Sequence, residues 1–182
     1  MGAFRVRFSF LVLTALLFLL RDEKLILSLA AVCAVHEAGH LTAMSLTGAR
    51  VRSVTLSAAG IRIETVRTPL RSVPRDILVL LAGPFANVLM YILLTAAHCP
   101  GSFPMLNLAA AAYNLLPYRT LDGGAVVGAL ICGTPREHDC LRVLRIFQGI
   151  VSLTLLAPAV RCGGEYALPF WISLALFAGD LR

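Results

Sequence analysis

Charged side chains are scarce in this sequence. Of its 182 residues, 14% are charged and 58% are hydrophobic, whereas soluble domains carry about 25% charged residues. So few charges cannot cover a surface that faces water, and the composition therefore predicts an integral membrane protein. The length allows one domain, spanning 1–182. No cluster of Lys and Arg is interleaved with aromatic residues, which argues against nucleic-acid binding.

The cysteines form no framework. They are five in number and none is part of a CxxC pair, so a set of structural disulfides is not expected. Cys99 and Cys162 fall in short loops predicted to lie on the same side of the membrane, so one disulfide between them is an open alternative. The first apolar run ends in "RDEK" at 21–24 rather than in a small-residue cleavage site, so we expect a retained membrane anchor.

Six apolar segments predict an all-α polytopic membrane protein with about six transmembrane helices. They cover residues 8–20, 25–47, 77–97, 103–131, 146–160 and 167–179. The second, third and fourth reach the roughly 20 residues that a span needs, although Pro117 is expected to break the fourth. With six spans, most Arg residues fall in segments on the same side of the membrane as the N-terminus. The positive-inside rule then predicts that both termini are cytoplasmic.

One loop on the cytoplasmic side has a different pattern. In "VRSVTLSAAGIRIETV" (about 51–66) apolar residues alternate with polar ones on both sides of Gly60. This pattern predicts a membrane-associated β-hairpin. A surface hairpin that merely connects two spans is an alternative interpretation.

The sequence "HEAGH" at 36–40 lies within the second apolar segment. On a helix, HExxH places His36 and His40 one turn apart on the same face, where both can bind one zinc ion, and Glu37 can act on the water that the metal activates. Ionisable side chains at mid-bilayer are costly, by about 2.5–3.5 kcal/mol on insertion scales. The alternative, a metal-free cluster of helix-packing side chains, explains one buried histidine but not three such residues.

A catalytic zinc site needs a third protein ligand. The pattern HExxHxxGxxH is absent, since Ala43 and Leu46 occupy the Gly and His positions. Asp122 is the acidic residue of the fourth apolar segment, and its depth, counted at helical rise, roughly matches that of the histidines. Glu64 is the alternative, but it lies in a predicted strand outside the bilayer.

Three further side chains have two interpretations each. Asn114, eight residues before Asp122, is predicted to be catalytic, donating to the substrate backbone or an oxyanion. For Asn87 we favour hydrogen bonding between helices. Cys33 is interpreted as a small buried residue rather than a thiolate ligand.

At these residues the chain resembles the site-2 protease family of intramembrane zinc metalloproteases. Three motifs match in order: "HEAGH" at 36–40, "GPFAN" at 83–87 and "NLLPYRTLDGG" at 114–124. The chain looks most similar to the small bacterial sporulation-type branch, whose members release a transcription-factor precursor from the membrane. One departure is Thr120, because relatives often have proline just before Leu-Asp-Gly.

The resemblance implies a membrane-embedded metalloprotease domain with a three-helix catalytic core at about 25–131. It implies one zinc ion on His36, His40 and Asp122, and Glu37 as the catalytic residue. It also implies that the hairpin takes up a membrane-tethered protein substrate as an added strand. Many relatives carry PDZ or CBS domains; here we expect control by separate regulatory or inhibitor proteins of the same bacterial cell membrane.

Two rival functions follow from the same residues. A zinc transporter would need histidines and acids along a pathway, whereas this chain has one cluster. A proteolytically inactive scaffold would bind clients without cutting them, but it would have no need of Glu37. Metal-assisted peptide hydrolysis in or near a transmembrane segment is therefore the function that the sequence favours.

Overall fold

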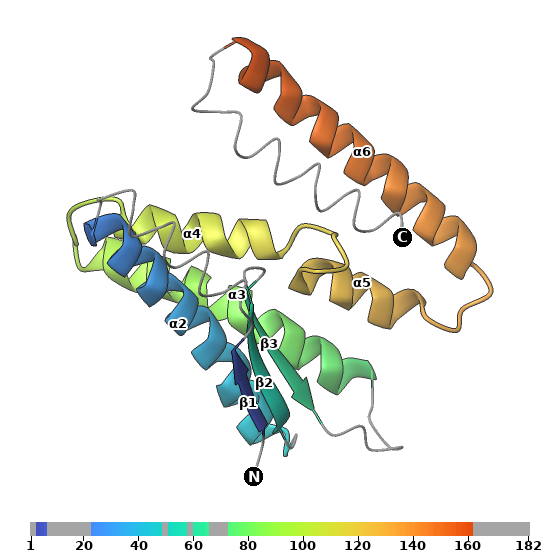
Figure 1. Cartoon of the computed structure of the whole chain (residues 1–182), viewed down its shortest axis with the longest axis horizontal. Helices are drawn as coiled ribbons and strands as arrows, with labels where there is room; N and C mark the ends of the chain where they lie inside the picture. Colours follow the sequence, from blue (N-terminus) through green and yellow to red (C-terminus); the bar gives the residue numbers. More distant parts are fainter. Residues whose placement is uncertain (1–2, 7–22, 49–50, 58–59, 66–72, 162–182) are drawn as a thin grey trace. The chain divides into compact units, whose positions relative to one another are not determined.

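The computed structural model describes residues 3–6, 23–48, 51–57, 60–65 and 73–161. These residues form three strands and five helices (Figure 1). The chain divides into two compact units, Met1–Asn114 and Leu115–Arg182. The predicted apolar segments 8–20 and 167–179 lie outside the described residues. One domain over 1–182 stays a prediction.

Helices α2 (Glu23–Leu46) and α3 (Val73–Ala96) correspond to the second and third predicted spans. Each has 24 residues and is therefore about 36 Å long, more than the roughly 30 Å of a hydrocarbon core. Among the described helices, these two are long and apolar enough to cross a membrane. Large apolar side chains on both face outward, with Leu27 72% and Phe85 66% exposed. Such outward surfaces suit lipid better than water.

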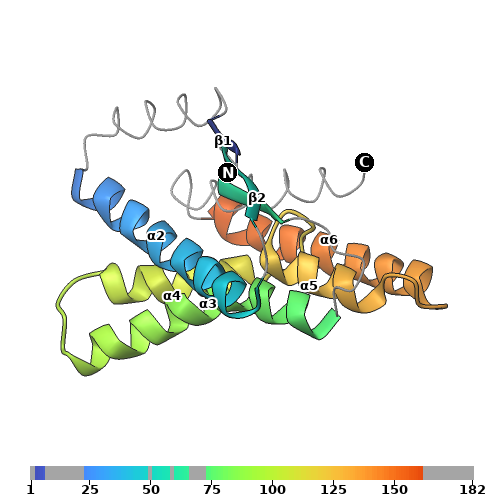
Figure 2. The same ribbon diagram turned by 90° about the horizontal axis from the view of Figure 1, so that it is seen from below.

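Helices α2, α3 and α4 (Phe103–Asn114) pack against one another and form the core of the first unit (Figure 2). The apolar contact centres on Ala43 and Met44 of α2 and Val79 of α3, with Ala82 packed against them. Without a strong hydrophobic force between helices in lipid, close packing of small residues is what holds such a core together.

The fourth predicted span is not one helix. Its residues form α4, with 12 residues, and α5 (Asp122–Ile131), with 10, and residues 115–121 between them are not helical. Neither helix alone reaches span length. The expected break at Pro117 is thus confirmed, but it is wider than a kink because the chain makes turns there, such as Leu121 N–H to Tyr118 O at 2.8 Å.

The three strands form one sheet in the order β1 (Ala3–Val6), β2 (Val51–Ser57) and β3 (Gly60–Thr65). β2 and β3 are antiparallel, as the two arms of the predicted hairpin should be; residues 58–59 lie outside the described part. β1 pairs with β2 in parallel. β1 is an addition to the predicted architecture: four residues are too few for an alternation pattern to be recognised.

In the second unit, α5 is followed by α6 (Glu137–Arg161). The sequence predicts a span at 146–160, but the helix begins at Glu137 because polar residues extend its first turns. Gln148 of α6 is 1% exposed and donates from Nε2 to the Pro117 carbonyl, while the Tyr118 hydroxyl donates to the Gln148 carbonyl at 3.4 Å. These two bonds attach residues 115–121 to α6.

Candidate metal centre

His36 and His40 lie on the buried face of α2. Both imidazoles are 8% exposed, and with Val32 and Ala43 they follow the three- and four-residue spacing of one helix face. Glu37 is half-buried beside them. Buried polar side chains require hydrogen-bond partners or a metal, so the partners of the two rings determine what this face can bind.

The imidazole of His40 has a fixed orientation. Its Nδ1 lies 2.8 Å from the main-chain carbonyl of Val79 on α3. A carbonyl oxygen can only accept a hydrogen bond, so Nδ1 carries a proton, and in the neutral ring Nε2 then presents a lone pair. The structure therefore supplies the outer partner that metal-binding histidines usually have.

The second nitrogen of each ring points to a shared position. Nε2 of His36 and Nε2 of His40 are 3.1 Å apart. Two imidazoles that bind one tetrahedral zinc at about 2.0–2.1 Å would hold their nitrogens about 3.3 Å apart. The pair thus fits a common ion with little movement of either ring.

Helix α3 is shaped to receive these rings. Val79, Gly83 and Asn87 follow one another at four-residue intervals, which places them on one face. A Cβ added to Gly83 would lie 2.8 Å from His36 Cε1 and would overlap the ring of His40. Glycine at this position is therefore what makes room for both imidazoles.

Asn87 of α3 makes a hydrogen bond to helix α2, as we expected from the sequence. It is 0% exposed, and its Nδ2 lies 3.4 Å from Nδ1 of His36. The predicted hydrogen bond between helices is therefore confirmed, and its partner is a histidine of the HEAGH motif. The spacing of "GPFAN" alone could not reveal this, because the contact depends on how α2 and α3 cross.

Asp122 is the first residue of α5. The turn before it is close to the helix, since an added Cβ on Gly123 or Gly124 would overlap the carbonyl of Leu115 or of Tyr118. The two glycines therefore allow residues 115–121 to fold over the start of α5. A carboxylate in the first turn is also favoured by the helix dipole. Tyr118 and Gln148, which hold this turn, were not recognised from the sequence because their contact joins residues 30 apart.

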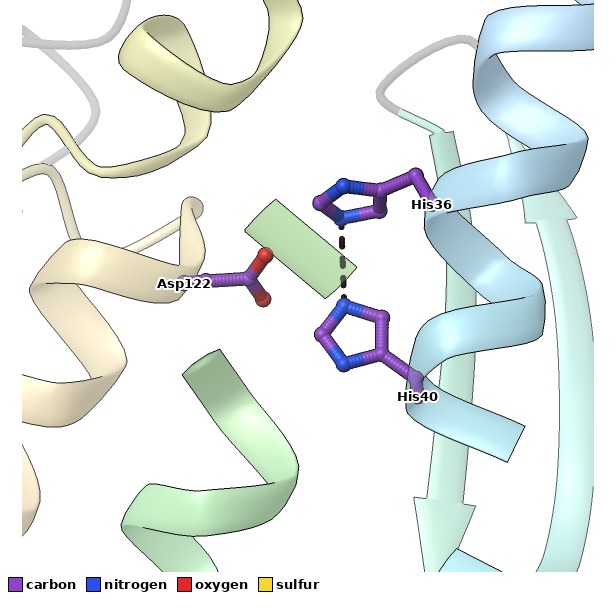
Figure 3. A group of neighbouring side chains, drawn as sticks. All are labelled: His36, His40 and Asp122. Carbon is purple, nitrogen blue, oxygen red and sulfur yellow. Dashed lines mark hydrogen bonds between the residues drawn. The ribbon is translucent and has the colours of Figure 1, made fainter. Parts of the chain in front are cut away.

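One ligand atom from each of His36, His40 and Asp122 lies within 4.8 Å of the other two (Figure 3). Two imidazoles and a carboxylate could hold a metal ion, and they are a donor set that zinc uses in catalytic sites. The alternative ligand, Glu64, lies in β3 opposite Ser53 of β2 and is not a member of this group.

Two other side chains singled out from the sequence are Asn114 and Cys33. Asn114 is the last residue of α4, and one N–H of its amide donates to the Ala110 carbonyl at 3.0 Å. Cys33 is exposed, so the expectation that it is a buried residue is wrong, and it is not among the grouped ligands. Cys99 is exposed and Cys162 lies outside the described residues, so their pairing stays a prediction.

Comparisons with known proteins give one informative likeness. No family model matches the sequence, and no curated protein matches it. Among solved structures, the fold is similar to that of a site-2 protease from Methanocaldococcus jannaschii, with a TM-score of 0.69 and 16% identity over 99% of this chain and 90% of that one. At this identity the likeness shows the fold: the chain has a site-2 protease-like fold, with two apolar helices suited to a membrane.

Proposed function

We propose that this protein is an intramembrane zinc metalloprotease that hydrolyses a peptide bond in or near the transmembrane segment of a membrane-tethered protein. The observation that supports it most is the grouping of His36, His40 and Asp122, with both histidines near the middle of a helix long enough to span a bilayer. His36 is 13 residues after Glu23, about 20 Å along the helix. A soluble metalloenzyme has no need to place its metal ligands this far along a helix of membrane-spanning length.

In this proposal His36, His40 and Asp122 hold one zinc ion per chain. When bound, zinc supplies Lewis-acid polarisation and activates water at neutral pH. Glu37, next to His36, accepts the proton of the attacking water and delivers it to the nitrogen of the leaving amine. The Val79 carbonyl keeps the His40 ring in the orientation that metal binding needs.

Asn114 is proposed as a donor to the substrate. A primary amide has two N–H groups, and the bond to Ala110 uses one of them. The other can donate to the oxygen that becomes negative during attack, where one such donor contributes about 2.7–4 kcal/mol. A helical substrate must first unwind, and freed backbone is tolerated only against protein or water; the non-helical residues 115–121 are suited to receive it.

The sheet is proposed as the place where substrate is held. In the order β1-β2-β3, β3 is an edge strand of the described sheet, and an extended peptide can add to such an edge through main-chain hydrogen bonds. The pairing of β1 with β2 supports a common side for the N-terminal segment and the hairpin. We propose that this side, with both termini, is cytoplasmic, in a bacterial cell membrane.

For the substrate class, we propose a single-span protein such as the transcription-factor precursors released by sporulation-type relatives. We further propose control by separate membrane proteins that regulate or inhibit cleavage. Comparing fragments released from membrane proteins in bacteria that express the wild type or Glu37→Gln identifies candidate substrates. A substrate should release its soluble part only with the wild type.

The proposal is then tested with purified protein, zinc and the substrate so identified. The wild type should cut within or beside the transmembrane segment, and Glu37→Gln should bind zinc but show no cleavage. Zinc flux across vesicles without cleavage would indicate a transporter. Substrate binding without cleavage by the zinc-loaded wild type would indicate a scaffold. Either result would overturn the proposal.

A further inference from the structure

Four groups at the interface of α2 and α3 form a continuous line of hydrogen bonds. Asn87 Nδ2 lies 3.4 Å from His36 Nδ1, His36 Nε2 lies 3.1 Å from His40 Nε2, and His40 Nδ1 lies 2.8 Å from the Val79 carbonyl. All three side chains are buried. The line begins at a side-chain amide and ends at a main-chain carbonyl.

The fixed end determines where each proton lies. Because the Val79 carbonyl can only accept, His40 carries its proton on Nδ1 and accepts at Nε2. His36 must then donate from Nε2, which leaves its Nδ1 as an acceptor. Asn87 Nδ2 is the donor that fills it. The donor and acceptor roles are consistent along the line from Asn87 to the Val79 carbonyl.

Metal binding requires the opposite tautomer of His36. A ligating nitrogen presents a lone pair, so Nε2 must give up its proton and Nδ1 must carry one. The Nδ1 proton would then face the Nδ2 of Asn87, which is also a donor. Two donors cannot bond, and a buried unsatisfied donor destabilises the site.

The same amide contains the acceptor that this tautomer needs. Asn87 Oδ1 is buried and has no hydrogen-bond partner among the residues that the structure describes. Turning the amide by about 180° places Oδ1 against His36 Nδ1, since the two ends of the group have nearly the same shape.

We propose that Asn87 is a positioning residue that selects the tautomer of His36: its N–H holds the proton on Nε2, and its turned C=O holds the proton on Nδ1 when metal binds. The proton moves from Nε2 to Nδ1 of the same ring, so no net proton is released by His36. His40 needs no such change because its acceptor is main chain. This proposal rests on metal binding at His36 and His40, as the proposed function does, but not on proteolysis.

Zinc affinity measured with the full-length chain in detergent, by competition with a chelating dye, tests the role of the amide. Asn87→Leu, which removes both donor and acceptor, should bind zinc about 10–100-fold more weakly. Asn87→Asp, which only accepts, should bind zinc at least as tightly as the wild type.

Asn107 of α4 provides a matched control. It is also 0% exposed with a buried Oδ1 that has no partner among the described residues, but its Nδ2 donates to the Phe103 carbonyl of its own helix at 3.0 Å. Asn107→Leu should leave zinc affinity within about threefold of the wild type. An equal loss in both Leu variants would mean that only packing is involved and would overturn the proposal.

The protonation of His36 itself gives a second readout, needed if Asn87→Leu fails to fold. The ¹⁵N shifts of labelled imidazoles distinguish protonated from unprotonated nitrogens, and removing His98 and His138 leaves the two rings of interest. In the wild type, His36 Nδ1 should be unprotonated with chelator and protonated with zinc. In Asn87→Asp it should be protonated in both conditions.

Each result has one meaning. If folded Asn87→Leu binds zinc as tightly as the wild type, the proposed role of Asn87 is wrong. The same holds if His36 of the wild type keeps one tautomer with chelator and with zinc. Neither result bears on the proposed function. A wild type that binds zinc but never cleaves overturns the proposed function and leaves this inference intact. A wild type that binds no zinc overturns both.

Discussion

Gly39 of α2 lies against Ala86 of α3 so closely that a Cβ added to Gly39 would stand 2.7 Å from the Ala86 Cβ. The same atom would overlap the Ala82 carbonyl. This close approach brings the α2 histidines to the Val79 carbonyl and the Asn87 amide. The glycine inside "HEAGH" is therefore part of the helix packing that builds the site.

Gly39→Ala should destabilise the protein. The added methyl group cannot be accommodated without separating α2 and α3, and overpacking of this kind costs about 1–3 kcal/mol. The measurement is the thermal unfolding midpoint in detergent. Gly128 of α5 is the matched control, since an added Cβ there meets nothing within 4 Å. Gly128→Ala should be neutral or stabilising by up to about 1 kcal/mol, and equal midpoints for the two variants would contradict the packing described.

Gly83→Ala should weaken metal binding. The new methyl group would occupy space that the His40 ring now fills. Displacing a packed ring costs about 1–3 kcal/mol, which corresponds to a loss of roughly 5–150-fold in zinc affinity. Competition with a chelating dye measures this loss. A Gly83→Ala protein with wild-type zinc affinity would show that the imidazoles bind no metal in the positions described.

Asp122→Asn should lower zinc affinity by at least tenfold, because a neutral amide replaces the anionic ligand while the shape is kept. The control is Asp139→Asn. Asp139 lies in the first turn of α6 with its side chain 77% exposed and 3.9 Å from Arg142, a surface pair that contributes about 0–1 kcal/mol. Zinc content after gel filtration distinguishes them; loss in neither variant would exclude Asp122 as the third ligand.

The part of the site that depends on local spacing could be predicted from sequence. HExxH on one helix fixes the separation of His36 and His40 whatever surrounds them, so the motif can be recognised without knowledge of any tertiary contact. Asp122 could be proposed because few acidic residues occur in apolar segments. The spans of α2 and α3 follow from length and hydropathy in the same way.

What could not be predicted depends on contacts between distant residues. Val79 acts through its main-chain carbonyl, so no property of its side chain marks it. Asn87 and Gln148 are polar residues in apolar helices, a pattern that fits packing and function equally well. Strand β1 is stabilised by its pairing with β2, and the four residues from Ala3 to Val6 carry no signal of their own.

The central claim is a zinc ion bound by two imidazoles and a carboxylate, and X-ray absorption of the zinc-loaded full-length protein measures it directly. We predict one zinc per chain with nitrogen and oxygen neighbours at about 2.0–2.2 Å, two of them imidazole, and no sulfur near 2.3 Å. A zinc–sulfur distance in the spectrum, or a folded protein that retains no zinc after loading, would contradict the account.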